Sequence, residues 1–143
     1  MNDFYSLGLL TGMASLALSK ALNAALIENN IDLPHSQFVV LRILYFHDGM
    51  SQLEIANMIS KDAAAIKRTV DNLENKGLAV RKQVRTLKNS VCITDKGREL
   101  MPQVLKIANQ IIEEALDGFS EESREQLFSM LKMIYQNITK KTL

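Results

Sequence analysis

The sequence of 143 residues contains little cysteine, proline or glycine. Cys92 is the single cysteine, which excludes an internal disulfide and a cysteine-rich zinc site and agrees with a reducing cytoplasm. Two prolines and six glycines leave long stretches without a helix breaker. These stretches are rich in Ala, Leu, Ile, Met, Glu and Lys, so we expect one mainly helical domain over residues 1–143, located in the cytoplasm.

The sequence also lacks the motifs of common enzyme sites. It has no HExxH pair, no glycine-rich phosphate loop and no Gly-x-Ser-x-Gly. His35 and His47 lie at the two ends of one expected helix, ~18 Å apart, and therefore cannot share a metal ion within a subunit. We expect no enzyme activity, no cofactor and no metal.

The longest apolar stretch runs from Phe4 to Ile27, with Lys20 as its only charge. A signal peptide or a membrane span would explain it, but the chain opens Met1-Asn2-Asp3 without a positive region, and several polar residues interrupt the stretch. We therefore expect no contact with a membrane. The pattern favours a helix of a soluble protein from Asp3 to about Asn29, buried on most of its circumference.

The formal charge of +1 is unevenly distributed. Residues 61–100 carry ten Lys or Arg and five Asp or Glu, a net +5, whereas residues 1–60 carry a net −3 and residues 101–143 a net −1. A surface that faces phosphates needs such a basic segment, but a solvated helix face would show the same charge. Charge alone does not decide between them.

Two short helices precede this basic segment. The first is expected from about Pro34 to His47, with Gly49 as its stop. Ser51-Gln52-Leu53-Glu54 then matches a capping box, which predicts a second helix from Ser51 to near Ser60. Its expected apolar side comprises Leu53, Ile55, Ala56 and Ile59.

A third helix is expected from about Asp62 to Lys76, before Gly77. Spacings of three and four predict one buried ridge, made of Ala63, Ile66, Val70 and Leu73. The opposite side carries Lys61, Ala64, Arg68, Asp71 and Asn72, with Ala65 and Lys67 at its margins.

After Gly77 the apolar period changes to that of strands. We predict strands at Leu78–Val84 and Ser90–Thr94 around a basic turn at residues 85–89, with inward-facing side chains at Val80, Val84, Val91 and Ile93. Two tightly joined helices followed by a basic hairpin predict a winged helix-turn-helix. Helices from Thr94 or Asp95 to about Leu116, and from Ser120 onwards, complete a fold that is mainly α with a small β-hairpin wing.

Four stretches resemble the MarR (multiple antibiotic resistance regulator) family in order and spacing. They are Gln37-Phe38-x-x-Leu41, Ser51-Gln52-x-Glu54-x-Ala56, Val70-Asp71-x-Leu73-Glu74-x-Lys76-Gly77-Leu78 and Ile93-Thr94-Asp95-Lys96-Gly97. The resemblance covers nearly the whole chain and implies a DNA-reading lobe at residues 34–96 and a helical dimerisation lobe at residues 1–32 and 97–143. It implies a transcriptional repressor that binds near-palindromic double-stranded DNA as a homodimer.

A dimer also follows from the residues themselves, since the apolar excess of Phe4 to Ile27 needs a second surface that a twofold partner supplies. Its two reading helices would meet half-sites about one DNA turn apart, ~34 Å.

The resemblance also assigns the DNA contacts. Arg68 and Lys67 would carry most of the polar readout, Arg68 through a bidentate pair with guanine. Three alanines stand where hydroxyls or Arg are common in the family, and they either meet a thymine methyl or reflect helix propensity alone. The candidate DNA-binding residues are Ser36, Ser51, Gln52, Lys61, Ala63, Ala64, Ala65, Lys67, Arg68, Arg85 and Lys88.

The wing departs from the family pattern. The family typically has an Asp-x-Arg pair there, whose Arg enters the minor groove, but this chain has Arg85 and Leu87 in those places and a hairpin about two residues shorter. Arg85 and Lys88 therefore either contact DNA or form a solvated basic turn.

Two further features remain open. The resemblance implies a cleft for a small aromatic effector, with Tyr5, Met13, His35, Phe38 and Arg42 as candidate lining, although these side chains serve equally well as core. Cys92 beside the wing is either a redox switch or, as we expect, a small strand residue.

The alternative to a DNA-binding regulator is a winged-helix protein interaction module without DNA binding. The three alanines of the reading helix and the altered wing would suit such a module.

Overall fold

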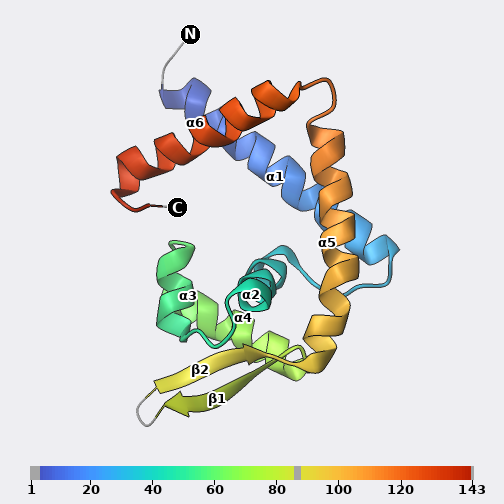
Figure 1. The fold of residues 1–143 in the computed structure, drawn as a ribbon, viewed down its shortest axis with the longest axis vertical. Coiled ribbons are helices and arrows are strands. Elements are labelled where there is room, and N and C mark those ends of the chain that lie inside the picture. The colour runs from blue at the N-terminus through green and yellow to red at the C-terminus, as the bar shows by residue number, and fades with distance from the viewer. Residues whose placement is uncertain (1–3, 86–87, 143) are drawn as a thin grey trace.

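The computed structural model describes the backbone of residues 4–85 and 88–142, and their side chains except at positions 4, 5, 84, 85 and 88. This part of the chain forms six helices and a two-stranded antiparallel sheet (Figure 1). The elements are α1 (Phe4–Glu28), α2 (His35–Phe46), α3 (Gln52–Met58), α4 (Ala63–Asn75), β1 (Ala79–Arg85), β2 (Lys88–Ile93), α5 (Asp95–Ala115) and α6 (Glu121–Thr139). The predicted class, mainly α with a small β-hairpin wing, is confirmed.

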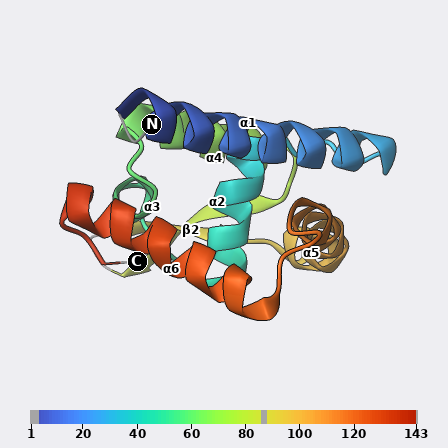
Figure 2. The same ribbon diagram turned by 90° about the horizontal axis from the view of Figure 1, so that it is seen from above.

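The elements form two lobes joined by α5. One lobe holds α2, α3, α4 and the hairpin, whereas α1 and α6 extend away from it (Figure 1). Seen from above, α1 and α6 run on either side of α2 (Figure 2). The end of α6 reaches back to the turn between α3 and α4, where the Tyr135 hydroxyl lies 3.3 Å from Ser60 Oγ and Lys141 Nζ donates to the Asn57 carbonyl at 3.4 Å.

Side-chain caps fix where the helices begin. The predicted capping box of α3 is present: the Glu54 amide donates to Ser51 Oγ at 3.2 Å, and the Ser51 amide donates to Glu54 Oε2 at 2.7 Å. Thr94, rather than Asp95, caps α5, because its Oγ1 accepts from the Gly97 amide at 3.1 Å. Ser120 caps α6 as expected. These caps satisfy amides that a helix leaves without an internal partner.

The apolar side of the two helix-turn-helix helices is narrower than predicted. On α4 the buried ridge is Ile66, Val70 and Leu73, whereas Ala63, the first helical residue, is exposed. On α3, Leu53 is 62 % exposed although Ile55 is fully buried. Two residues along an α-helix turn through about 200°, so α3 cannot bury Leu53 and Ile55 against one neighbour. The assignments of Ala63 and Leu53 to the core were wrong.

The register of the hairpin corrects a second prediction. Val80 lies opposite Cys92, and Arg81 lies opposite Val91. Residues opposite each other in an antiparallel pair share a face, so Val80 cannot face inwards together with Val91. The buried apolar side chains of the two strands are Ala79, Val91 and Ile93, while Val80 is half-buried and the side chain of Val84 is outside the described residues. The predicted face of β1 was therefore wrong by one residue.

The strands extend further toward the turn than predicted, and they do not include Leu78 and Thr94 at their other ends. Their pairing continues through Gln83 with Asn89 to Arg85 with Lys88, with an irregularity between Gln83 and Arg85. Residues 85, 88 and 89, which were predicted to form the turn, therefore belong to the strands, and residues 86–87 lie outside the described residues.

Helix α1 is far less buried than predicted. It contacts α5 and α2, and its buried side chains are Leu22 and Leu26 near its C-terminal end. The preceding turns expose Leu7, Leu9, Leu10, Met13 and Leu16 by between 51 % and 65 %. The prediction that this helix is buried on most of its circumference was wrong for a single chain, because only the C-terminal end of α1 reaches the core. The stretch Ser6–Glu28 is also long and apolar enough, by length and composition, to cross a membrane.

Candidate nucleic-acid interface

Helix α4 offers one bare side to solvent. Asp62 caps its start, with Oδ1 accepting from the Ala65 amide at 2.7 Å. The preceding turn includes Ser60 in a left-handed conformation at φ +53°, so that only residues 59–62 separate the end of α3 from the start of α4. The exposed residues on and just before α4 are Lys61, Asp62, Ala63, Ala64, Lys67, Arg68, Asn72 and Asn75. This side of α4 is open to a partner, as the sequence predicted.

Arg68 is the cation best placed for recognition. It lies in the second turn of α4, on the side of the helix opposite to the buried residues Ile66 and Val70. Its guanidinium has no hydrogen bond or ion pair with the part of the chain that the structure describes, so all five of its donors are available.

Lys67 is in a different position from Arg68. Its Nζ lies 2.9 Å from Asp71 Oδ2, one turn further along α4. The Lys67 side chain is 65 % exposed and Asp71 is 40 % exposed. A phosphate that approached Lys67 would therefore compete with a carboxylate already in contact with it.

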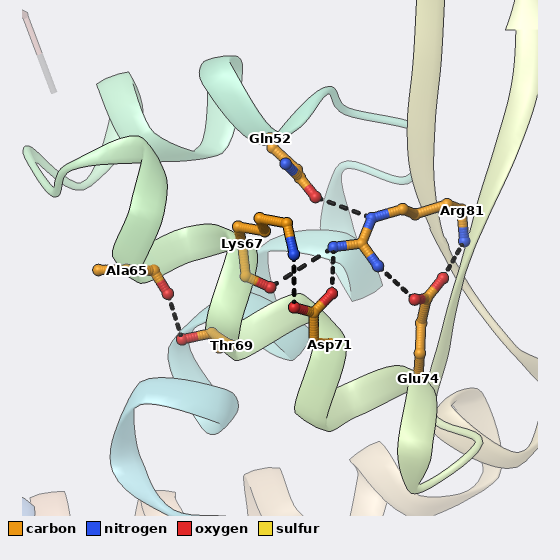
Figure 3. Close-up of polar contacts among 7 residues, drawn as sticks. All are labelled: Gln52, Ala65, Lys67, Thr69, Asp71, Glu74 and Arg81. Atoms are coloured by element: carbon orange, nitrogen blue, oxygen red, sulfur yellow. Dashed lines mark hydrogen bonds and ion pairs between the residues drawn. The ribbon is translucent and has the colours of Figure 1, made fainter.

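Arg81 was not singled out in the sequence, yet it joins the wing to both helices of the helix-turn-helix (Figure 3). Its Nε donates to Gln52 Oε1 of α3 at 2.8 Å, and its Nη2 donates to Asp71 Oδ1 of α4 at 2.7 Å. Its Nη1 pairs with Glu74 Oε2, while its backbone amide donates to Glu74 Oε1 at 2.7 Å. Arg81 therefore fixes the wing against the reading helix.

A sequence signal for Arg81 existed. Asp71 and Glu74 are three residues apart and so lie on one side of α4, which calls for a cation nearby. The hairpin register, which places Arg81 on the inward face, supplies that cation.

Several cations of the basic segment serve the fold in the same way. Lys76 Nζ donates to Gln37 Oε1 at 2.7 Å and pairs with Asp32 at 3.0 Å. Arg98 pairs with Asp48 at 2.6 Å, and the Asp48 carboxylate also accepts from the Ile93 amide. Among the described side chains of residues 61–100, the exposed cations without an ion pair include Lys61, Arg68 and Lys82. The net +5 therefore overstates the charge available to DNA.

The remaining candidate DNA contacts fall around α4. Ser36 is exposed in the first turn of α2. Ser51 and Gln52 at the start of α3 are half-buried, and the oxygens of both side chains are already hydrogen-bonded within the protein. Ala65 is half-buried. The side chains of Arg85 and Lys88 lie outside the described residues, so the predicted contacts of the wing remain predictions.

The candidate effector residues are only partly brought together. The rings of His35 and Phe38 on α2 lie 6.4 Å apart, and Arg42 on the same helix lies over Phe46 with Cζ 5.2 Å from the ring centroid. Met13 is 59 % exposed on α1, and the side chain of Tyr5 is outside the described residues. A hollow along α5, lined by Pro102, Leu105, Lys106, Asn109, Gln110, Glu113 and Glu114, contains none of the five.

Cys92 has the surroundings of a structural thiol. It is half-buried in β2, and burial raises the pKa of its thiol above the ordinary value, with Asp48 adding to the increase. Reactive cysteines have lowered pKa values. The geometry thus favours the interpretation of Cys92 as a small strand residue.

The model of the MarR family matches residues 33–85, which span α2, α3, α4 and β1. The chain belongs to the MarR family. A curated relative, the uncharacterized HTH-type transcriptional regulator YybA of Bacillus subtilis (strain 168), is 28 % identical over 130 residues, 89 % of this chain and 85 % of that protein. The protein is accordingly a MarR-family DNA-binding transcriptional regulator.

Two solved structures share the fold. A MarR-family regulator from Listeria monocytogenes, solved in complex with 26mer DNA, is 28 % identical, with a TM-score of 0.83 over 96 % of this chain and 90 % of that one. CouR from Rhodococcus jostii RHA1, bound to p-coumaroyl-CoA, is 23 % identical, with a TM-score of 0.79 over 90 % of both chains. The MarR arrangement therefore extends beyond residues 33–85 to α1, α5 and α6.

Proposed function

We propose that this MarR-family protein is a homodimeric repressor whose α4 helices read two halves of a near-palindromic site in double-stranded DNA. The observation that carries the proposal is the exposed side of α4, on which Arg68 has no partner among the residues that the structure describes. A guanidinium on the bare side of a reading helix can pair with guanine O6 and N7 in the major groove. The DNA complex of the Listeria monocytogenes relative supports this use of the lobe.

In this proposal the neighbouring side chains position the lobe on the DNA. Lys61 is exposed just before α4 begins, and Ser36 is exposed next to Gln37, which accepts from Lys76 at the other end of α4. Phosphates would pass both side chains, and the Gln52 amide NH2 remains able to donate. Exposed Ala63 and Ala64 allow close approach to bases or thymine methyls. Phosphate contacts of this kind fix register and orientation, whereas the base contacts of Arg68 would give specificity.

The two lobes would be joined through α1 and α6. Helix α6 buries none of its residues within one chain and exposes Phe128, Met130, Leu131, Met133, Ile134 and Ile138 by 38 % to 80 %. Together with the exposed leucines of α1, these side chains leave more apolar area in water than monomers usually expose. A second copy of the chain would cover it with a self-complementary interface. A soluble dimer of this kind would reside in the cytoplasm.

The effector would bind between this helical lobe and the reading lobe. The bound p-coumaroyl-CoA of the Rhodococcus jostii relative supports a small aromatic ligand. His35 and Phe38, whose rings are close together at the start of α2, would form part of its site. We expect thermal stabilisation by a member of a panel of phenolic acids and their thioesters, and no stabilisation by any of them would count against an effector of this class.

The test of the proposal is selection of bound fragments from the source genome with purified protein, followed by binding assays on the recovered site. We expect a near-palindrome, and Arg68→Ala should weaken binding to it by about 1–3 kcal/mol while changing binding to random DNA less. Gln103→Ala, an exposed change on α5, is the matched control. A protein interaction module would instead recover no common sequence.

Dimerisation is tested separately, by measuring the mass in solution. Wild-type protein should sediment as a dimer, and Leu131→Lys on α6 should sediment as a monomer because a charge cannot be buried unpaired in an apolar interface. A monomeric wild type would contradict the proposed dimer.

A further inference from the structure

The Asp71 carboxylate lies between two cations (Figure 3). Lys67 Nζ donates to its Oδ2 at 2.9 Å, and Arg81 Nη2 donates to its Oδ1 at 2.7 Å. Arg81 is the less exposed of the two cations, at 28 % against 65 % for Lys67, and it is also held by Gln52 and Glu74. Asp71 is therefore held by a partly buried, multiply bonded partner on the wing and by a solvent-exposed partner on its own helix.

This arrangement places a persistent negative charge at the edge of the bare side of α4. The hydrogen bonds from Lys67 and then from Arg81 lower the pKa of Asp71, so the carboxylate stays ionised at neutral pH. The neighbouring cation Arg68 has no such partner among the described residues. Two adjacent cations of one reading helix thus differ in their availability to DNA.

We propose that Asp71 is a specificity-determining residue that holds Lys67 away from the phosphates, so that Arg68 rather than sequence-independent attraction dominates binding. The inference rests on the proposed DNA-binding function of α4. Non-specific affinity comes from Lys and Arg side chains that neutralise phosphates and release counterions, whereas base contacts discriminate between sequences. A lysine that is paired in the free protein contributes less to non-specific affinity. The ratio of specific to non-specific affinity therefore increases.

The experiment compares D71N with wild type on the selected operator and on a random duplex, at several salt concentrations. Release of Lys67 should steepen the dependence of log K on log salt by about 0.9 per chain, or about 1.8 for the proposed dimer, so that a fourfold rise in salt changes Kd by about 12-fold more than in wild type. The random duplex should be bound more tightly at low salt, and the ratio between the two DNAs should fall. Arg81 keeps Glu74 and Gln52 as partners, so D71N should remain folded.

Two further variants isolate the cause. Adding Lys67→Ala to D71N should restore the wild-type salt slope, because the released cation is then gone. Glu125→Gln removes the same unit of charge from an exposed position on α6, away from α4, and should leave the slope unchanged.

Other results of these binding assays would overturn the inference about Asp71 or the proposed function. If D71N weakens binding to both DNAs, lowers the melting temperature and leaves the slope unchanged, Asp71 only supports the fold and the inference is overturned. If D71N does not fold, Lys67→Met in the wild-type background decides: an unchanged slope supports the inference, and a slope lower by about 0.9 per chain overturns it. A wild type that prefers no sequence over random DNA refutes the proposed function instead.

Discussion

Gly97 stands where the connecting helix α5 comes closest to the hairpin, and Gly97→Ala should destabilise the protein. A Cβ at this position would lie 2.5 Å from the Leu78 carbonyl oxygen and 2.7 Å from Ile93 Cγ1. The Leu78 carbonyl cannot easily move, because the Thr94 amide donates to it at 3.1 Å. Only glycine therefore allows α5 to begin directly beside β1 and β2.

The magnitude follows from two opposing effects. Forcing one methyl group into a packed region costs about 1–3 kcal/mol, and contacts with a hydrogen-bonded backbone oxygen place this site at about 2–3 kcal/mol. Alanine recovers about 1 kcal/mol as the better helix former. The net loss should be about 1–2 kcal/mol, or about 4–8 °C in the melting temperature of a chain of this size.

The assay is thermal and urea unfolding at a fixed protein concentration, since a dimer melts at a concentration-dependent temperature. Glu99→Ala is the control: it places an alanine at an exposed site one half-turn further along α5 and should change stability by less than about 0.5 kcal/mol. A Gly97→Ala protein as stable as wild type, or more so, would refute the close approach of α5 to the hairpin.

Two further predictions concern the start of α4 and the thiol of β2. Asp62→Ala removes the oxygen that caps α4 and should lower the free energy of unfolding by about 1 kcal/mol, whereas Asp62→Asn should cost only a few tenths; equal losses in urea denaturation would show that the cap has no role. Cys92, whose pKa burial raises, should be alkylated at pH 7.5 at least about tenfold more slowly in the native protein than in urea, and equal rates would indicate an accessible, reactive thiol.

The local features of the fold were predictable from sequence, because neighbouring residues determine them. The capping box at Ser51 and Glu54, the N-cap at Ser120 and the bounds of α1 and α4 depend on contacts within one or two helical turns. The predicted bare side of α4 followed from helical periodicity alone, and Arg68 lies on it as expected.

The features that were missed depend on contacts distant in sequence. Period-two alternation cannot tell which face of β1 packs inwards, since a shift of one residue exchanges the faces, and the pairing with β2 decides the matter. The role of Arg81 depends on that register, since it joins residues 10 and 29 positions away. The exposure of α1 depends on what lies outside a single chain, and composition alone does not reveal it.

The small number of available cations links dimerisation to DNA binding in the function we propose. Because Lys67, Lys76, Arg81 and Arg98 form ion pairs within the chain, one lobe offers few charges to phosphates. A lobe with few phosphate contacts binds any DNA weakly. Joining two lobes makes the second binding event intramolecular, which raises overall affinity without any new contact in either lobe. We therefore expect Leu131→Lys, which leaves α4 unchanged, to weaken operator binding at least as much as Arg68→Ala does. Retention of operator affinity by a monomeric Leu131→Lys protein would mean that a single lobe carries more positive charge to the DNA than its internal ion pairs allow.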